Sequence, residues 1–277
     1  MDKDGGLHER EADFHDRWAS ETSVERVMVR ECFEALSAQE NRFIVRLVAE
    51  KMGGFKGKRV LDLGPGLGES AIYFALQGAY VTATDISPEM VKLCIEAAAY
   101  HGVEDRVRGL VIPADGFDLE EKGFDIIFAA NLFHHIQDIG PMLVNIKRHL
   151  RPGGMLISWD PVAYNPVINV YRRMAEKVRT EDEHPLKVRD MNTIRGVFPD
   201  MRHKEFWFTT LVIFLKYYFI DRKDPNEYRY WKEILKETDA TIGWWFRPLL
   251  ALDCALRNIP GVRWLAWNTV VWGTRTD

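Results

Sequence analysis

Three closely spaced glycines beside an acidic residue are the feature of this sequence that most clearly indicates chemistry. An apolar run over residues 59–63 is expected to form a strand, and a helical pattern follows over residues 70–77. Glycine lets a backbone turn sharply and approach a ligand, because it has no Cβ atom. The free N–H groups at the start of the helix would then face that ligand. The pattern predicts a nucleotide-like cofactor site at the end of the first strand. The site would contain Asp62, Gly64, Gly66 and Gly68.

The glycine spacing indicates which kind of cofactor binds. A dinucleotide site has the spacing G-x-G-x-x-G, whereas this chain has G-x-G-x-G followed directly by Glu69. Asp62 would repel a diphosphate but would attract a cofactor with a cationic amino-acid end. Asp85 follows a second expected strand and is placed to accept hydrogen bonds from ribose hydroxyls. The spacing therefore disfavours an NAD-dependent oxidoreductase.

These motifs resemble those of the class I S-adenosylmethionine-dependent methyltransferases, and the core motifs are similar to those of quinone-biosynthesis methyltransferases. The first family motif is present as D-L-G-x-G-x-G, and the second ends in Asp85-Ile86-Ser87. The resemblance covers residues 58–160. It implies binding of S-adenosyl-L-methionine through Asp62, Gly64, Gly66, Gly68, Asp85 and Ile86. The alternative is an α/β domain with a tight glycine turn and no ligand.

Further cofactor contacts are implied after the third and fourth expected strands. Asp115, followed by Gly116, stands where the resembled family accepts a hydrogen bond from the adenine amino group. The alternative for Asp115 is a turn or a helix cap. The string N-L-F-H-H follows the fourth strand, at a position where ligands bind in such sheets. Its backbone could hold the methionine end of the cofactor, with Asn131 and Phe133 as the predicted contacts.

Three side chains are candidates for a general base or for orienting the acceptor. His134 could accept a proton near neutral pH, although both histidines of the string could instead cap the next helix and pack on the core. Asp160 ends the fifth strand and could orient the acceptor or cap a helix. His184 belongs to the polar loop 179–186, which could close over the acceptor or could only be solvated. No histidine or acidic cluster has metal-ligand spacing, so no metal is expected.

Composition excludes several classes of protein. The net charge of −4 and a pI near 6.1 argue against a general nucleic-acid binder. Cys32, Cys94 and Cys254 are scattered, which fits a reducing cytosol rather than a disulfide framework. The N-terminus is polar and lacks a signal-peptide core. Apolar segments fall short of the roughly 20 residues that span a bilayer. We therefore expect a cytoplasmic protein.

The order of the expected elements predicts an α/β fold. Strands alternate with helices between residues 59 and 159, which indicates a parallel sheet with right-handed crossovers. We expect a Rossmann-like, seven-stranded methyltransferase sheet, mostly parallel, with a late antiparallel strand. The expected strands are residues 59–63, 80–84, 107–112, 124–130, 155–159, 203–210 and 268–273. The expected helices include residues 24–52, 70–77, 88–101, 139–150, 166–179 and 191–198.

The segments outside the core are expected to cover the site. In the resembled family an N-terminal helix can cover the cofactor, which would place Phe14 or Trp18 near the sulfonium. Additions near the last two strands often cover the acceptor pocket. The aromatic-rich segment 211–261 could instead be a peripheral membrane face or a homodimer contact. The expected parts are an N-terminal helical lid (1–55), the cofactor-binding core (56–210), an aromatic-rich cap (211–261) and the last strand (262–277).

The motifs and the aromatic cap together predict a reaction. We expect an S-adenosylmethionine-dependent methyltransferase that acts on a small, rather apolar or lipid-linked acceptor by in-line displacement at oxygen. A base is needed only if the acceptor must lose a proton during attack. The alternative is a non-catalytic protein that uses the same fold to sense the cofactor or to act as a scaffold.

Overall fold

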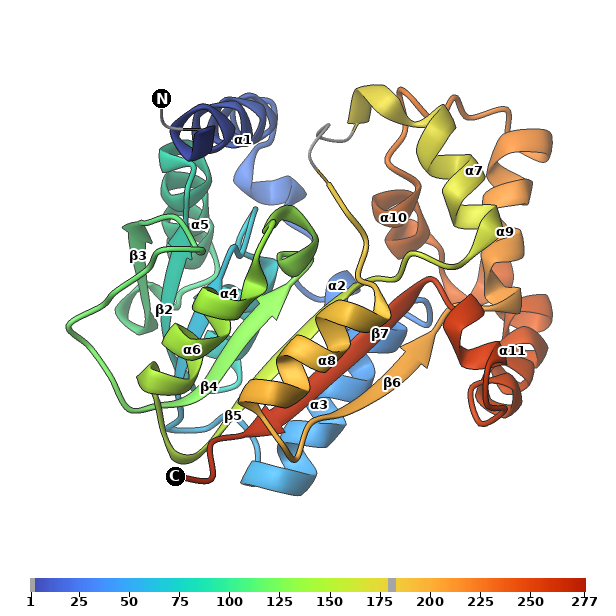
Figure 1. The fold of residues 1–277 in the computed structure, drawn as a ribbon. Helices are drawn as coiled ribbons and strands as arrows, with labels where there is room; N and C mark the ends of the chain where they lie inside the picture. The colour runs from blue at the N-terminus through green and yellow to red at the C-terminus, as the bar shows by residue number, and fades with distance from the viewer. Residues whose placement is uncertain (1–2, 179–182) are drawn as a thin grey trace.

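A seven-stranded sheet forms the centre of the molecule. A computed structural model describes residues 3–178 and 183–277. The strands follow the order β3-β2-β1-β4-β5-β7-β6 (Figure 1). β1 to β5 are parallel, and β7 runs antiparallel to β5 and β6. This arrangement confirms the expected fold class. The strands are β1 (Arg59–Leu63), β2 (Tyr80–Asp85), β3 (Val107–Val111), β4 (Phe124–Ala130), β5 (Leu150–Pro161), β6 (Arg202–Phe206) and β7 (Asn268–Thr274).

Both faces of the sheet are buried. Successive residues of a strand point to opposite faces, so each central strand supplies apolar side chains to two separate clusters. Val60 and Ile126 pair across β1 and β4 in one cluster, and Leu61 and Ile127 pair in the other. Because both faces are filled, the carboxyl ends of the parallel strands are where such a sheet binds a ligand.

Capping residues fix where the core helices begin. The Ser87 side chain accepts a hydrogen bond from the N–H of Met90, and Pro88 occupies the first turn, where its missing N–H costs nothing. Asp138 caps the next helix through the N–H of Gly140. The core helices are α4 (Glu69–Leu76), α5 (Pro88–Tyr100), α6 (Ile139–His149), α7 (Pro166–Met174) and α8 (Val188–Val197).

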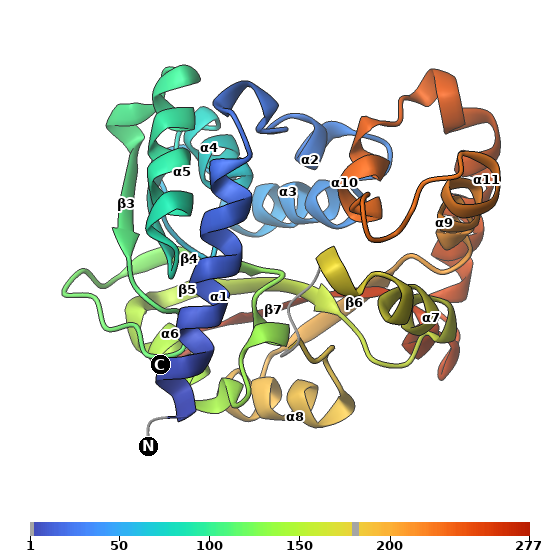
Figure 2. The same ribbon diagram turned by 90° about the horizontal axis from the view of Figure 1, so that it is seen from above.

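The N-terminal region differs from the single helix predicted over residues 24–52. It forms α1 (Lys3–Ser20), a short 3-10 turn, α2 (Glu31–Glu34) and α3 (Gln39–Met52), and α1 lies beside α5 (Figure 2). The prediction was wrong because Ala35 adopts an extended backbone. The break lets the Ser37 hydroxyl donate to the carbonyl of Ile234, 2.9 Å away, a contact that one straight helix would not make.

A helical segment separates β6 from β7. β6 ends at Phe206, so the strand predicted over residues 203–210 is too long. Trp207 has a φ of 66°, which turns the chain out of the sheet, and Asp253 then accepts hydrogen bonds from the N–H groups of Phe208 and Thr209. The helices of this segment are a 3-10 turn (Thr209–Leu211), α9 (Val212–Leu215), a π-helix (Lys216–Ile220), α10 (Tyr230–Glu233), a second 3-10 turn (Ile234–Lys236), α11 (Asp239–Leu256) and a third 3-10 turn (Val262–Leu265).

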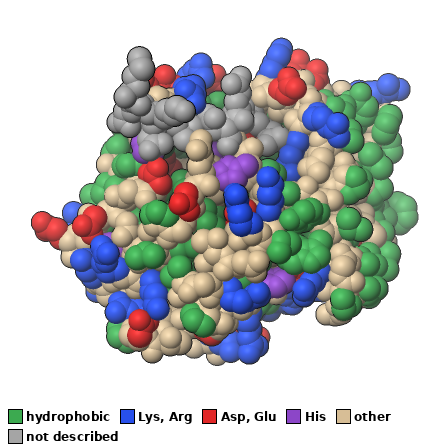
Figure 3. All heavy atoms as spheres, in the orientation of Figure 1, with side chains coloured by type: hydrophobic (Ala, Val, Ile, Leu, Met, Phe, Trp, Pro, Cys, Tyr) green, Lys and Arg blue, Asp and Glu red, His purple; other side chains and the backbone are tan. Residues whose placement is uncertain are grey.

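The outer face of this segment is apolar. Hydrophobic side chains gather over the edge of the molecule that carries α9 and α11 (Figure 3). Trp244 is 81% exposed and Ile220 is 73% exposed. Over the parts of the chain that the structure describes, the helices are too short or too polar to cross a membrane. Contact between the surface of residues 211–261 and a membrane therefore stays a prediction.

Candidate active site

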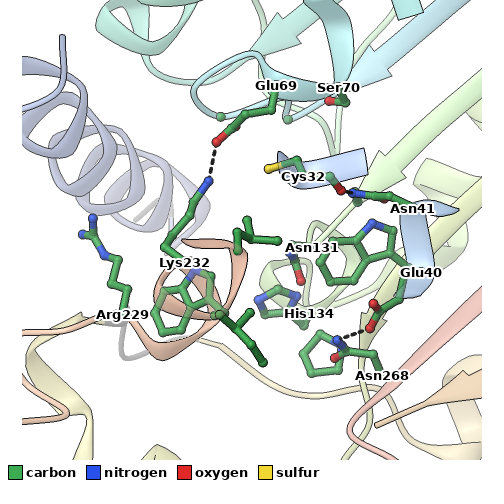
Figure 4. A pocket seen from close by; sticks show the side chains of 18 of the residues that line it. Cys32, Glu40, Asn41, Glu69, Ser70, Asn131, His134, Arg229, Lys232 and Asn268 are labelled. Atoms are coloured by element: carbon green, nitrogen blue, oxygen red, sulfur yellow. Dashed lines mark hydrogen bonds and ion pairs between the residues drawn. The ribbon is translucent and has the colours of Figure 1, made fainter. Parts of the chain in front are cut away.

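One cavity of about 300 Å³ lies at the carboxyl ends of the central strands. The glycine turn after β1 lines one side of it, and Asn131 and His134 enter from the end of β4. Residues of α1, α3 and the cap segment close the remaining sides. In Figure 4, Glu69 and Lys232 lie on one side of the pocket and Glu40 and Asn268 on the other.

The glycine turn has two distinct surfaces. Gly64, Gly66 and Gly68 all have positive φ values, of 66°, 55° and 91°. A Cβ atom on Gly66 would meet no atom within 4 Å, whereas one on Gly68 would lie 2.7 Å from the sulfur of Cys94. Gly66 therefore leaves open space at the cavity, and Gly68 permits close packing of the turn against α5. The open space at Gly66 is what a closely bound cofactor needs, so the turn fits the expected ligand.

Asp62 lies beneath the turn rather than in the cavity. Its side chain is 1% exposed and accepts a hydrogen bond of 2.5 Å from the hydroxyl of Ser70, which does line the cavity. Burial raises the pKa of Asp62 to about 7, the Ser70 hydrogen bond opposes that rise, and the nearby carboxylates Asp85 and Glu69 add to it. Asp62 thus supports the turn through Ser70.

Helix α1 covers the carboxylates predicted to bind adenosine. Asp85 accepts hydrogen bonds from the N–H groups of Gly66 and Ser87 at 3.3 and 3.0 Å. Asp115 lies 2.8 Å from Nε2 of His8 on α1. Asp85 and Asp115 are absent from the cavity lining, as are their neighbours Ile86, half-buried, and Gly116, exposed. The predicted adenosine contacts thus lie under α1, outside the cavity.

The turn after β4 separates two predicted cofactor contacts. Asn131 has a φ of 52°, its N–H donates to the carbonyl of Trp159 at 2.7 Å, and its side chain lines the cavity. Phe133 is fully buried in the apolar cluster beneath the sheet. Only the backbone of Phe133 therefore lies near the site.

His134 and Asp160 form a buried pair. Nδ1 of His134 lies 2.9 Å from Oδ1 of Asp160, whose other oxygen accepts from the Ser158 hydroxyl at 2.8 Å. Burial raises the pKa of Asp160 to about 7, and the hydrogen bonds from Ser158 and the backbone limit the rise. The structure thus joins two of the three candidate catalytic residues. His184 lies next to them, and its N–H donates to the carbonyl of His134.

The loop predicted over residues 179–186 is described only from residue 183, so its residues 179–182 lie outside the described part of the chain. Possible ligand atoms of Glu183, His134 and His135 all lie within 4.8 Å of one another. Burial would lower the pKa of His135, but Glu11 and Glu183 raise it overall. Sequence spacing gave no sign of this cluster, because Glu183 is distant in the chain.

The far end of the cavity holds residues that the sequence did not single out. Glu40, on α3, is 5% exposed and accepts a hydrogen bond of 2.7 Å from Nδ2 of Asn268, the first residue of β7. Trp159, Trp207 and Trp267 line the same cavity. The separation of 228 positions between Glu40 and Asn268 in the sequence explains why no local pattern revealed the pair.

The cap segment is tied to the rest of the site by charged side chains. Lys232 forms an ion pair with Glu69, the first residue of α4. Burial would lower the pKa of Lys232, but Glu69 raises it overall. The guanidinium of Arg229 lies 4.0 Å from the ring centre of Trp18 on α1, within range of a cation–π contact. Both contacts bring residues 229–232 over the cavity.

Residues 61–158 match the family model described as a methyltransferase domain. Together with the sheet order and the glycine turn, this match identifies the core as a class I S-adenosylmethionine-dependent methyltransferase domain. The predicted methyltransferase domain is thus confirmed for residues 61–158.

Named relatives match less than half of this chain. The chain is 28% identical to a sterol 4-C-methyltransferase of Caenorhabditis elegans over 43% of this chain and 35% of that protein. It is 29% identical to a ubiquinone biosynthesis O-methyltransferase of Aeromonas salmonicida over 42% of this chain and 50% of that protein. The chain thus spans half or less of the length of these curated relatives.

Solved structures of low identity share the fold. Phosphoethanolamine N-methyltransferase 2 of Haemonchus contortus, in complex with S-adenosyl-L-methionine, superposes with a TM-score of 0.59 at 16% identity, covering 96% of this chain and 60% of that one. A methyltransferase of Thermotoga maritima gives a TM-score of 0.57 at 16% identity, covering 95% and 99%.

Proposed function

We propose that this protein transfers a methyl group from S-adenosylmethionine to an oxygen atom of a small acceptor. The observation that carries the proposal is the placement of His134, supported by Asp160, in the same cavity as the glycine turn. When bound, the cofactor supplies a methyl group already activated by a sulfonium. The protein must then bring the reactants together, an effect worth up to about 7–11 kcal/mol in ideal cases.

His134 is the proposed general base. A carboxylate oxygen of Asp160 at Nδ1 favours the tautomer in which Nδ1 carries the proton, so that Nε2 can accept one from the acceptor hydroxyl. Asp160 is a positioning residue, because its side chain is fully buried and reaches the acceptor only through His134.

The cofactor contacts are proposed from the cavity outward. Gly64, Gly66 and Asn131 line the cavity and would hold the methionine end, while Phe14 and Trp18 of α1 close it from above. The adenosine would be held, once α1 has moved away from them, by Asp85, Ile86, Asp115 and Gly116. The surrounding turns would be supported by Asp62, Gly68 and the backbone of Phe133.

The cap segment supports a small acceptor. Trp231 and Leu235 line the cavity and cover its acceptor side with apolar surface. The named relatives act on a sterol and in ubiquinone biosynthesis, which also favours a small or lipid-like molecule over a polymer. We propose the same division of the chain as before, into residues 1–55, 56–210, 211–261 and 262–277.

Methyl transfer from labelled cofactor into small-molecule and lipid extracts tests the proposal. Label that enters only RNA or protein would contradict it. Cofactor binding without turnover on any extract would favour the non-catalytic alternative, which shares the fold.

A substitution separates catalysis from binding. We expect His134→Gln to lower kcat by roughly 10²–10⁴-fold while leaving the affinity for S-adenosylhomocysteine unchanged. His203→Gln is the matched control, because His203 pairs with Glu205 on β6, outside the cavity lining. Equal kcat values for the two variants would exclude His134 as the general base.

A further inference from the structure

The acceptor end of the cavity contains a buried carboxylate whose hydrogen-bond partners are neutral. Glu40 lines the cavity, is 5% exposed, and is bound by the Asn268 amide and the Trp207 indole. Burial raises the pKa of Glu40, and these hydrogen bonds only partly offset it. Arg257 also lowers the pKa of Glu40 through its charge, but among the described side chains no lysine, arginine or histidine forms an ion pair with Glu40. A buried carboxylate without a directly paired cation is costly, so the site is suited to a ligand that brings one.

Two amide groups add hydrogen-bond acceptors at the same end. Asn268 must direct Nδ2 toward Glu40, because a carboxylate only accepts, and this leaves Oδ1 of Asn268 as an acceptor. Asn41 donates through Nδ2 to the carbonyl of Cys32 at 2.8 Å, which leaves Oδ1 of Asn41 as a second acceptor. Both Oδ1 atoms are buried and lack a hydrogen-bond partner among the described residues. Buried polar atoms of this kind are rare and need an explanation.

Aromatic rings surround these acceptors. Trp159 and Pro161 lie on the same face of β5, and Pro161 pairs with Asn268 across β7. The Trp207 and Trp267 rings are 5.8 Å apart, and Trp207 contacts Glu40. Indole faces attract organic cations. The indole N–H of Trp159 is buried and lacks a partner within the described chain, so it could donate to an oxygen of the ligand.

We propose that the methyl acceptor carries a protonated primary amine, which is bound by Glu40, Asn268 and Asn41 between the indole rings. A primary ammonium has three N–H donors and one positive charge, and this end of the cavity has three groups that accept hydrogen bonds. A neutral hydroxyl would supply one donor and no charge. The identity of this ligand as the acceptor rests on the proposed function, but binding of the amine does not require methyl transfer.

The test compares 2-phenylethylamine with its neutral analogue 2-phenylethanol. Binding to the full-length protein, saturated with S-adenosylhomocysteine, is followed by tryptophan fluorescence and calorimetry. We expect wild-type protein to bind the amine at least roughly tenfold more tightly than the alcohol, because hydrogen bonds to a charged group are the stronger ones. Similar affinity for the two compounds, or no measurable binding of the amine, would overturn the proposal.

Variants identify the residue that is responsible. Glu40→Gln should abolish the preference for the amine without changing the affinity for S-adenosylhomocysteine, and Asn268→Ala should weaken it. Glu50→Gln is the matched control, because Glu50 is an exposed glutamate on the same helix. A preference that survives Glu40→Gln would contradict the assignment. Failure of S-adenosylhomocysteine to bind at all would instead contradict the proposed function, while the comparison of amine with alcohol could still be made on the ligand-free protein.

Discussion

Two neighbouring glycines offer a matched test of how the cofactor turn is built. Gly66→Ala and Gly68→Ala each add one methyl group to a residue with positive φ, which costs about 1–2 kcal/mol. At Gly66 the new Cβ meets open space, so this is the whole expected loss of stability. At Gly68 the Cβ would lie 2.7 Å from the sulfur and 3.1 Å from the Cα atom of Cys94. Overpacking of this kind adds about 1–3 kcal/mol.

Thermal unfolding of the ligand-free variants measures the stability difference, at about 2–4 °C in Tm per kcal/mol for a chain near this size. Calorimetric titration with S-adenosylhomocysteine measures the second effect. Gly66→Ala should lose affinity about tenfold or more while folding nearly as well as wild type, whereas Gly68→Ala should lose mainly stability. Wild-type affinity in Gly66→Ala, or an equal fall in Tm for both variants, would refute our assignment of the two surfaces.

Three further predictions concern a buried acid, an ion pair and the cap surface. Because the pKa of Asp62 is raised from 3.8 to about 7, the folded protein keeps a proton that the unfolded chain loses, so stability falls as pH rises between these values. Urea unfolding of Asp62→Asn should show a smaller fall in stability with rising pH. A fall equal to that of the wild type would contradict the assignment of this pH dependence to Asp62. Lys232→Met should lower the free energy of unfolding by about 1–3 kcal/mol, because its ion pair with Glu69 is only partly exposed. Adding Glu69→Gln should restore part of the lost Tm. A double variant with no recovery of Tm would argue against the ion pair. Trp244 and Phe219, the latter on the π-helix, are both exposed apolar side chains of the cap segment. Trp244→Glu with Phe219→Glu should therefore reduce co-sedimentation with lipid vesicles, and unchanged sedimentation would argue against membrane contact.

Local patterns predicted the first four strands to within one residue, whereas β5 runs from Leu150 to Pro161 and is longer than the predicted 155–159. β1 and β4 begin and end at the predicted residues, because each is a short apolar run that ends in a turn. The N-terminal helix pattern over residues 24–52 misled us, since apolar spacing persists across a break that is set by contacts with the cap. Periodicity reports which residues are buried, but it does not report where a distant partner interrupts the backbone.

The cofactor turn was more predictable than the acceptor end. Glycines 64, 66 and 68 form a contiguous motif whose backbone geometry follows from residue type. Glu40 and Asn268 become a site only when α3 and β7 meet, and neither residue belongs to a recognisable string. The Asp160 carboxylate was named as a candidate from its place after a strand, but its pairing with His134 required the three-dimensional register of β4 and β5.

The cation–π contact between Arg229 and Trp18 joins the two covers of the cavity, one from each end of the chain. The helix that we propose to cover adenosine and the segment that we propose to cover the acceptor are therefore in direct contact. We expect the spent cofactor and the methylated product to leave in a concerted manner, so that release of one accelerates departure of the other. Rapid-mixing measurements of the two dissociation rates would reveal this interdependence.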